Sequence, residues 1–208
     1  MSTTPKINWS NDVPKIIEKM SKRPLIGLDR DGTLNVDLGT YVTTPDNFKP
    51  IEGSLEAVAR LRRLGFKIVI ITNQGGIEKG IVTQQEVEAV NQRMLDLLGE
   101  AGCPSIDALY YSASSRKDDM YAKPNTGMFK RCEKENPHLR FKGGYYVGDK
   151  MSDLRAAVKM NAKPVLVRTG YGIETEKELS KFTYRDIRKK TIIFDDLSSF
   201  VDWVIEQD

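Results

Sequence analysis

Cysteine and histidine are scarce in this sequence. Its 208 residues include two cysteines, Cys103 and Cys132, which lie far apart and outside any CxxC or Cys/His grouping, and a single histidine, His138. We therefore expect both cysteines to be free thiols in a reducing compartment. The sequence also lacks a run of about 18 apolar residues, and its beginning lacks the apolar segment of a signal peptide. These absences predict a cytoplasmic protein with no membrane partner.

A strong excess of charge of one sign is also missing. The 32 basic and 29 acidic side chains leave a formal net charge of +3, which is too little to indicate a broad nucleic-acid surface. A chain of 208 residues suits one sizeable α/β domain and is too short for two full ones. We expect an N-terminal arm over residues 1–23 and one domain over residues 24–208. The sequence does not determine the oligomeric state.

What the sequence does contain is an alternation of short apolar runs and helical stretches. The apolar runs are rich in β-branched or aromatic residues on both faces, as strands buried on both sides should be. They occupy residues 25–29, 67–72, 106–111, 144–149, 164–168 and 191–194. Helices are expected over residues 54–65, 83–99, 151–160 and 196–207. The alternation predicts a three-layer, Rossmann-like α/β fold, in which helices cover a parallel sheet.

Polar side chains follow several of the predicted strands, at the points where the strands end. Asp29 and Asp31 follow the first strand, Thr72 ends the second, and Asp149 ends the fourth. Lys123 lies in a loop ahead of a further helix. Because ligands of a parallel α/β sheet gather beyond the carboxyl ends of its strands, we expect these side chains to converge. Carboxylates brought together repel one another unless a cation intervenes, and their oxygens suit Mg²⁺.

The spacing of the first two aspartates indicates phosphoryl chemistry. In a straight strand Asp29 and Asp31 would point to opposite faces, so the chain must curl, and Gly32 allows it to do so. Asp29 can then attack a phosphoryl group as a carboxylate nucleophile, while Asp31 protonates the leaving oxygen and later activates water. Thr72 and Lys123 would hold the transferring phosphoryl oxygens.

Five motifs together resemble the phosphatases of the haloacid dehalogenase superfamily. They are DRDGTLN (29–35), DNF (46–48), GF (65–66), TNQGGI (72–77) and VGDKMSDLRAA (147–157). Over residues 24–170 the chain is most similar to the branch that contains heptose 1,7-bisphosphate phosphatases and histidinol phosphatases. The resemblance implies a capless member of the superfamily with an open site that is shielded by loops. It also implies a Mg²⁺-dependent phosphomonoesterase for a small phosphorylated sugar, with heptose 1,7-bisphosphate as the expected substrate.

The resemblance also assigns roles to individual residues. Asp29 is the implied nucleophile and Asp31 the implied acid and base. Asp29, Asp149 and the main-chain carbonyl of Asp31 are the implied ligands of Mg²⁺, and Asp153 lies next to the metal. The positions that match substrate contacts of the family are Asn73, Gln74 and Lys150.

One segment departs from the pattern of the branch. Its members carry a zinc loop of cysteines and a histidine before an Arg-Lys-Pro segment, whereas residues 110–124 contain no such ligand, and Ala122 replaces the arginine. We therefore expect no zinc. Arg116 and Lys117 are expected to compensate by contacting the substrate. The loop should be held by hydrogen bonds and ion pairs of Ser112, Ser114, Ser115, Arg116, Lys117, Asp118 and Asp119.

Three alternatives to the sugar phosphatase stay open. The segment YAKPNTGMF (121–129) also resembles the corresponding loop of polynucleotide 3′-phosphatases, which would make nucleic acid a partner under that alternative only. A histidinol phosphatase is the second. The third is a protein that binds a phosphorylated ligand without turnover, although such a protein needs no paired carboxylates.

Overall fold

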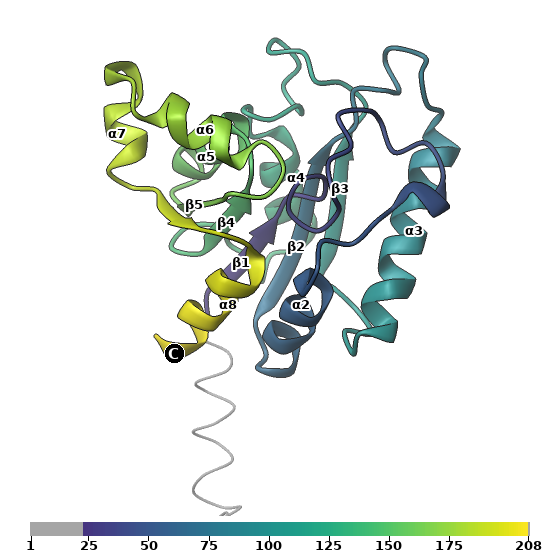
Figure 1. The fold of residues 1–208 in the computed structure, drawn as a ribbon, viewed down its shortest axis with the longest axis horizontal. Helices are drawn as coiled ribbons and strands as arrows, with labels where there is room; N and C mark the ends of the chain where they lie inside the picture. The colour runs from purple at the N-terminus through teal and green to yellow at the C-terminus, as the bar shows by residue number, and fades with distance from the viewer. Residues whose placement is uncertain (1–22, 208) are drawn as a thin grey trace, which may run out of the picture.

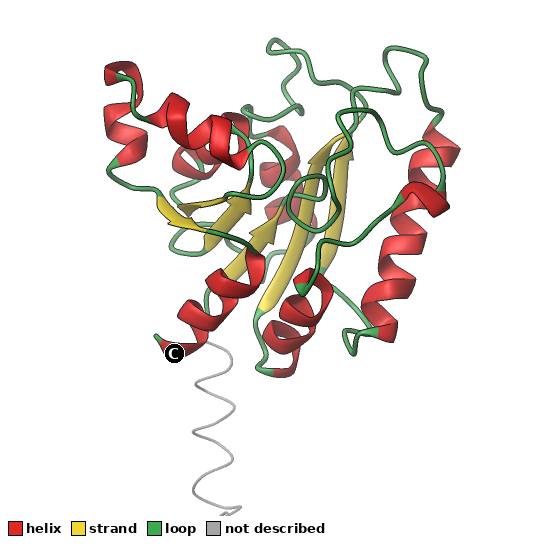
Figure 2. Ribbon diagram, in the orientation of Figure 1, coloured by secondary structure: helices red, strands yellow, loops and turns green. Residues whose placement is uncertain are grey.

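The computed structural model describes residues 23–207, which form one six-stranded sheet with helices on both faces (Figures 1 and 2). The strands are β1 (Leu25–Leu28), β2 (Lys67–Asn73), β3 (Ala108–Ser112), β4 (Tyr145–Gly148), β5 (Lys163–Val167) and β6 (Ile192–Phe194). All neighbouring strands are parallel, in the order β3-β2-β1-β4-β5-β6. The predicted class, a three-layer parallel α/β fold, is confirmed.

The longer helices lie where the sequence predicts them, with ends shifted by one or two residues. The helices are α2 (Ser54–Arg63), α3 (Gln84–Glu100), α4 (Gly127–Glu135), α5 (Met151–Lys159), α6 (Gly172–Leu179), α7 (Arg185–Arg188) and α8 (Leu197–Glu206). The sequence did not predict α6 and α7. Both are short and bury few side chains, so they leave little apolar periodicity to detect.

Alternating residues of the central strands divide the core into two layers. In β2, Ile68 and Ile70 pack with residues of α2, α3 and α8, whereas Val69 and Ile71 pack with residues of α4 and α5. The period of two in a strand therefore gives each face of the sheet its own apolar contacts. Burial on both faces explains why the strands read as continuous apolar runs.

Loops cover the carboxyl ends of β1, β2 and β3. Within residues 23–207, the segments that join β1 to α2, β2 to α3 and β3 to α4 contain no helix or strand except the short 3-10 helix η1 (Pro45–Asn47). No inserted domain therefore caps this edge, as the resemblance implied. None of the helices in the described part of the chain has the length and apolar character needed to cross a membrane. The arm expected over residues 1–23 lies outside the described residues except for its last one, so it stays a prediction.

Candidate active site

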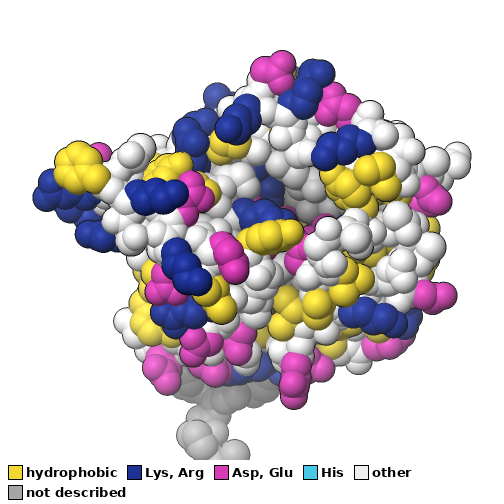
Figure 3. Space-filling view, turned by 45° about the horizontal axis from the view of Figure 1, so that its top comes forward, with side chains coloured by type: hydrophobic (Ala, Val, Ile, Leu, Met, Phe, Trp, Pro, Cys, Tyr) yellow, Lys and Arg dark blue, Asp and Glu magenta, His cyan; other side chains and the backbone are white. Residues whose placement is uncertain are grey.

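A cavity of about 630 Å³ opens at the carboxyl ends of the central strands, and Figure 3 shows it as a hollow with charged side chains at its rim. The loops after β1, β2, β3 and β4 and the turn before α6 supply its walls. Asp149 and Asp153 are fully buried next to it. The residues predicted from the sequence that line the cavity are Asp29, Asp31, Thr72, Asn73, Gln74, Lys117, Lys123 and Lys150.

A tight turn after β1 places Asp29 and Asp31 at the cavity. Gly32 has a φ of +83°, in the left-handed region that favours glycine. A Cβ at this position would also clash with the carboxylate of Asp149. The carbonyl of Arg30 accepts main-chain hydrogen bonds from the residues that close the turn. The predicted curl of the chain is therefore confirmed, and it requires glycine for two separate reasons.

A buried arginine and two amides hold the carboxylate of Asp31. The side chain of Arg30 is fully buried and donates to both Asp31 oxygens, from Nε at 3.0 Å and from Nη2 at 2.8 Å. Gln74 and Asn35 donate to the same carboxylate at 2.9 and 3.2 Å, and Asn91 accepts from Arg30 Nη1 at 2.8 Å. Burial raises the pKa of Asp31, but the charge of Arg30 and these hydrogen bonds outweigh it and hold the pKa below its usual value. Asp31 is thus a fixed carboxylate that is ionised at neutral pH.

Lys123 links Asp29 to Asp153. Its Nζ lies 2.8 Å from Oδ1 of Asp29 and 2.7 Å from Oδ1 of Asp153. The same ammonium group donates to the carbonyl of Ile71 at 2.9 Å and to the hydroxyl of Tyr146 at 3.1 Å. Desolvation lowers the pKa of Lys123, but the two carboxylates raise it well above its usual value. The lysine therefore stays charged although it is buried, and it offsets part of the repulsion between the carboxylates.

Asp29, Asp149 and Asp153 form an acidic cluster in which one oxygen from each residue lies within 4.8 Å of the others. Oδ2 of Asp149 accepts the N–H of Tyr171 at 2.8 Å, whereas its Oδ1 is buried and has no hydrogen-bond partner among residues 23–207. Burial raises the pKa of Asp149 to about 8, although the charge of Lys150 opposes this shift. An unpaired buried carboxylate oxygen beside two further carboxylates is a donor set that fits a hard divalent cation such as Mg²⁺.

The polar residues at the end of β2 bind other site residues as well as lining the cavity. Asn73 fixes the main chain of Lys123, because its Nδ2 donates to the Lys123 carbonyl at 3.0 Å and its Oδ1 accepts the Lys123 N–H at 2.9 Å. Gln74 Nε2 donates to the hydroxyl of Thr72 at 3.0 Å and to the carboxylate of Asp31 at 2.9 Å. The two amides that the family resemblance assigned to substrate contacts therefore also position the side chains of the site.

The three cations expected to contact substrate occupy different environments. Lys150 lines the cavity with its Nζ 2.9 Å from a carboxylate oxygen of Asp37 and 4.7 Å from the ring centroid of Tyr171. Lys117 lines the cavity from the loop after β3. Arg116 is not part of the cavity lining, and 63% of its side chain is exposed.

Polar side chains and ion pairs hold the loop after β3. Ser114 donates from its hydroxyl to Glu78 at 2.6 Å and accepts the N–H of Arg116 at 3.1 Å, while the hydroxyl of Ser112 accepts the N–H of Ser114 at 3.2 Å. Arg116 lies 3.1 Å from Glu78 and 3.3 Å from Asp118. The predicted hydrogen bonds of the two serines and the predicted pair between Arg116 and Asp118 are confirmed. The pair with Glu78 was not predicted, since it joins two separate loops.

Sequence reasoning missed several residues of the cavity wall. Lys79, Tyr41 and Ser115 line it from three different loops, and Tyr171 lines it ahead of α6. In addition, Thr169 donates from its hydroxyl to the carbonyl of residue 32 at 2.6 Å, which ties the loop after β5 to the turn after β1. None of these residues belongs to a motif. Only their position shortly after a strand could have drawn attention to them.

Known structures share the fold. The D,D-heptose 1,7-bisphosphate phosphatase of B. bronchiseptica, solved with magnesium and phosphate, matches with a TM-score of 0.80 and 28% identity, covering 89% of this chain and 100% of that chain. A haloacid dehalogenase superfamily hydrolase of Ehrlichia chaffeensis shares the fold at 12% identity, with a TM-score of 0.53 over 98% of this chain and 81% of that chain. The fold and the site define a phosphatase of the haloacid dehalogenase class.

The chain belongs to the polynucleotide kinase 3 phosphatase family, whose model matches residues 24–186. Among curated proteins, the D-glycero-beta-D-manno-heptose-1,7-bisphosphate 7-phosphatase of Pseudomonas putida is 35% identical over 175 residues, which cover 84% of this chain and 95% of that protein. The resemblance to the superfamily and to its heptose bisphosphate phosphatase branch is confirmed, as is the prediction of an enzyme.

Proposed function

We propose that this phosphatase removes the 7-phosphate of D-glycero-D-manno-heptose 1,7-bisphosphate, or a phosphate of a related small sugar, through a phosphoryl-Asp29 intermediate and with Mg²⁺ as its metal. The observation that carries the proposal is the acidic cluster of Asp29, Asp149 and Asp153, which lies against the buried ammonium of Lys123. The names of the curated relatives support the substrate.

The reaction proceeds in two steps. Lys123 and the main-chain N–H of Arg30 both bind Oδ1 of Asp29, at 2.8 and 2.7 Å, so Oδ2 is the oxygen that attacks phosphorus. The bond between phosphorus and the ester oxygen breaks, and Asp31 donates to the departing sugar oxygen the proton that it took from water in the preceding turnover. Water then gives a proton to Asp31 and attacks phosphorus, which breaks the bond to Asp29 and releases phosphate. The lowered pKa of Asp31 keeps it in the carboxylate form that can accept this proton.

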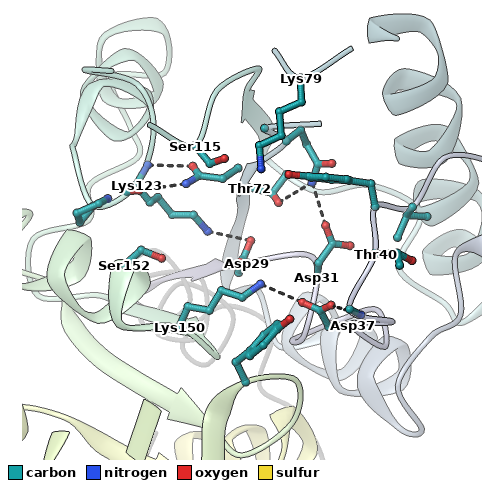
Figure 4. A pocket seen from close by; sticks show the side chains of 18 of the residues that line it. Asp29, Asp31, Asp37, Thr40, Thr72, Lys79, Ser115, Lys123, Lys150 and Ser152 are labelled. Carbon is teal, nitrogen blue, oxygen red and sulfur yellow. Dashed lines mark hydrogen bonds and ion pairs between the residues drawn. The ribbon is translucent and has the colours of Figure 1, made fainter. Parts of the chain in front are cut away.

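Mg²⁺ would be held by Asp29, Asp149 and the main-chain carbonyl of Asp31, with Asp153 next to it. When bound, the metal supplies positive charge that offsets the carboxylates and polarises a phosphoryl oxygen. The ammonium of Lys123 and the hydroxyl of Thr72 bind the remaining phosphoryl oxygens in the proposal, since both line the cavity beside Asp29 (Figure 4).

Substitution of the nucleophile is the direct test. Asp29→Asn keeps the shape of the side chain but removes the anionic nucleophile, so phosphate release from heptose 1,7-bisphosphate with Mg²⁺ should nearly vanish. Wild-type protein quenched in acid during turnover should carry one phosphoryl group on the peptide that contains Asp29, as measured by mass spectrometry. The matched control is Asp46→Asn on η1, where the side chain is exposed. An Asp29→Asn protein that retains even a tenth of the wild-type turnover would contradict the mechanism.

Hydrolysis of a nucleic-acid 3′-phosphate is the second candidate function. One observation favours it, namely the description of the family model that matches residues 24–186. A screen of phosphate release with heptose 1,7-bisphosphate, histidinol phosphate and a 3′-phosphorylated oligonucleotide separates the candidates. We expect the highest kcat/KM with the heptose bisphosphate, and a higher value with the oligonucleotide would replace the proposal.

The setting that we propose is cytoplasmic. Cys103 and Cys132 are free and buried, which supports a reducing compartment. Labelling of the thiols after denaturation under non-reducing conditions should therefore find two reactive cysteines per chain.

A further inference from the structure

Two lysines that line the cavity, Lys79 and Lys117, make no ion pair with a carboxylate of residues 23–207. Lys123 pairs with Asp29 on the floor of the cavity, and Lys150 pairs with Asp37 at its edge. Lys79 lines the same cavity, and no carboxylate of the described part of the chain lies within ion-pair distance of its ammonium group. This ammonium is therefore available to an anionic ligand.

The side chain of Lys79 is exposed, and Tyr41 of a neighbouring loop contacts it. Its Nζ lies 5.5 Å from the ring centroid of Tyr41, and a hydrogen bond with Tyr41 raises the pKa of Lys79, so the side chain is charged at neutral pH. Tyr41 in turn packs closely on Gly76, where a Cβ would lie 2.9 Å from the tyrosine ring. In the view of Figure 4, Lys79 enters the cavity from the side opposite Lys150, and Asp29 lies between them. The ammonium of Lys79 thus faces the cavity across from the paired lysine.

Lys117 also lines the cavity, but only Lys79 lies on the ring of Tyr41, so a second anionic group of a substrate has few other fixed partners among residues 23–207. The floor is acidic and, in the proposed function, takes the phosphoryl group that reacts. Ala122, which precedes the motif lysine, is uncharged and fully buried. Arg116 is outside the cavity lining and pairs with Glu78 and Asp118. A cavity of about 630 Å³ has room for a phosphorylated sugar that reaches from the floor to the wall.

We propose that Lys79, seated on Tyr41, binds the second phosphate of a bisphosphorylated sugar and so selects bisphosphates over monophosphates. The proposal rests on the proposed function, because it assumes that the reacting phosphoryl group binds next to Asp29. A point charge on a flexible stem suits this task, since an ammonium binds phosphate without demanding one geometry. The reacting phosphate is held elsewhere, so Lys79 acts on substrate binding and not on the chemical step.

The test compares two substrates that differ only in the second phosphate. In Lys79→Ala, the KM for heptose 1,7-bisphosphate should rise by about tenfold or more while kcat changes little. The KM for heptose 7-phosphate should stay the same. Lys79→Arg should restore much of the selectivity, and high salt should raise the bisphosphate KM more in the wild type than in Lys79→Ala. Lys142→Ala is the matched control, because this exposed lysine precedes β4 at the opposite edge of the sheet.

The outcomes separate this proposal from the proposed function. A wild type that hydrolyses neither heptose substrate overturns the proposed function, and the role of Lys79 is then measured on fructose 1,6-bisphosphate and fructose 6-phosphate. An equal effect of Lys79→Ala on bisphosphate and monophosphate, or no effect on either, overturns the role of Lys79. A loss confined to a 3′-phosphorylated oligonucleotide also overturns it, because the cation would then serve a nucleic-acid backbone.

Discussion

Asp29 and Asp31 are two positions apart in sequence, and their different partners suit them to different tasks. Asp29 shares a buried lysine with Asp153 and lies in the acidic cluster of the proposed metal site. Asp31 is bound by the guanidinium of Arg30 and the amide of Gln74, which fix its orientation. The structure thus gives a physical basis for one nucleophile and one acid-base residue in the same turn.

The proposed role of Asp31 predicts a change in the rate-limiting step. Asp31→Asn keeps the shape of the side chain but cannot accept a proton from water, so kcat should fall by roughly 10²–10⁴. With p-nitrophenyl phosphate, whose leaving group needs no protonation, one equivalent of nitrophenolate should appear in a burst before the slow turnover. Stopped-flow absorbance measures both phases. Unchanged turnover with this substrate would remove Asp31 from the acid-base role.

At the scale of elements, three loops build the site wall together. A Cβ on Gly75 would clash with the side chain of Ser115, and a Cβ on Gly76 would come within 3 Å of Tyr41 and Val82. The loops after β1 and β3 therefore both pack against the loop after β2 at Gly75 and Gly76. This contact explains how Lys79 and Lys117, which come from different loops, reach the same cavity.

The loop after β3 contains no cysteine or histidine, so we expect the protein not to retain zinc. A structural zinc site needs about four Cys or His ligands, whereas Cys103 in the loop after α3 and Cys132 in α4 are buried free thiols. The acidic cluster of Asp29, Asp149 and Asp153 is the one group of metal-ligating side chains found in residues 23–207. Elemental analysis of protein purified without added metal and dialysed should find far less than one zinc per chain. Near-stoichiometric zinc would show that the loop holds a metal by other ligands.

At the scale of the whole molecule, the order of the strands creates the site. β1 lies between β2 and β4 at the centre of the sheet, with Leu28 in register with Ile70 and Val147. The residues that follow these three strands therefore meet at one edge, although Asp29 and Asp149 are far apart in sequence. This convergence buries a cluster of like charges, Asp29, Asp149 and Asp153, whose repulsion lowers the stability of the whole domain.

Because Asp149 is buried in this cluster, we expect the free energy of unfolding of the metal-free protein to depend on pH. Burial raises the pKa of Asp149 from 3.8 to about 8. Between pH 3.8 and about pH 8, Asp149 therefore carries a proton in the folded state but not in the unfolded state. The free energy of unfolding should therefore fall as pH rises through this window. In EDTA, Asp149→Asn should melt at a higher temperature than the wild type at pH 8, and the difference should shrink at pH 5.

Thermal melts with and without Mg²⁺ complete the experiment. Mg²⁺ should raise the melting temperature of the wild type at pH 8, because it pairs with the buried carboxylates, and should have little effect on Asp149→Asn. If the wild type and Asp149→Asn in EDTA showed the same change in melting temperature between pH 5 and pH 8, Asp149 would not be the group that destabilises the fold.

The fold class and the residues of the cavity floor could be predicted from the amino-acid sequence alone. Apolar runs and helical spacing are local properties of a chain, and a parallel sheet brings the ends of its strands to one edge whatever the loops do. For this reason Asp29, Asp31, Thr72, Lys123 and Asp149 could be singled out before the structure was known. The short helices α6 and α7 were not predicted, because they bury too few side chains to produce an apolar periodicity in the sequence.

The side chains that complete the wall, and the contacts that hold them, depend on how distant segments of the chain pack together. Sequence reasoning expected Arg116 and Lys117 at the substrate. Lys117 lines the cavity together with Lys79, whereas Arg116 lies outside the lining and pairs with Glu78 of another loop. Likewise, Asn73 fixes the main chain of Lys123 across fifty positions of sequence. The direction of a loop side chain depends on contacts between segments that are distant in the chain, and neither local propensity nor periodicity carries that information.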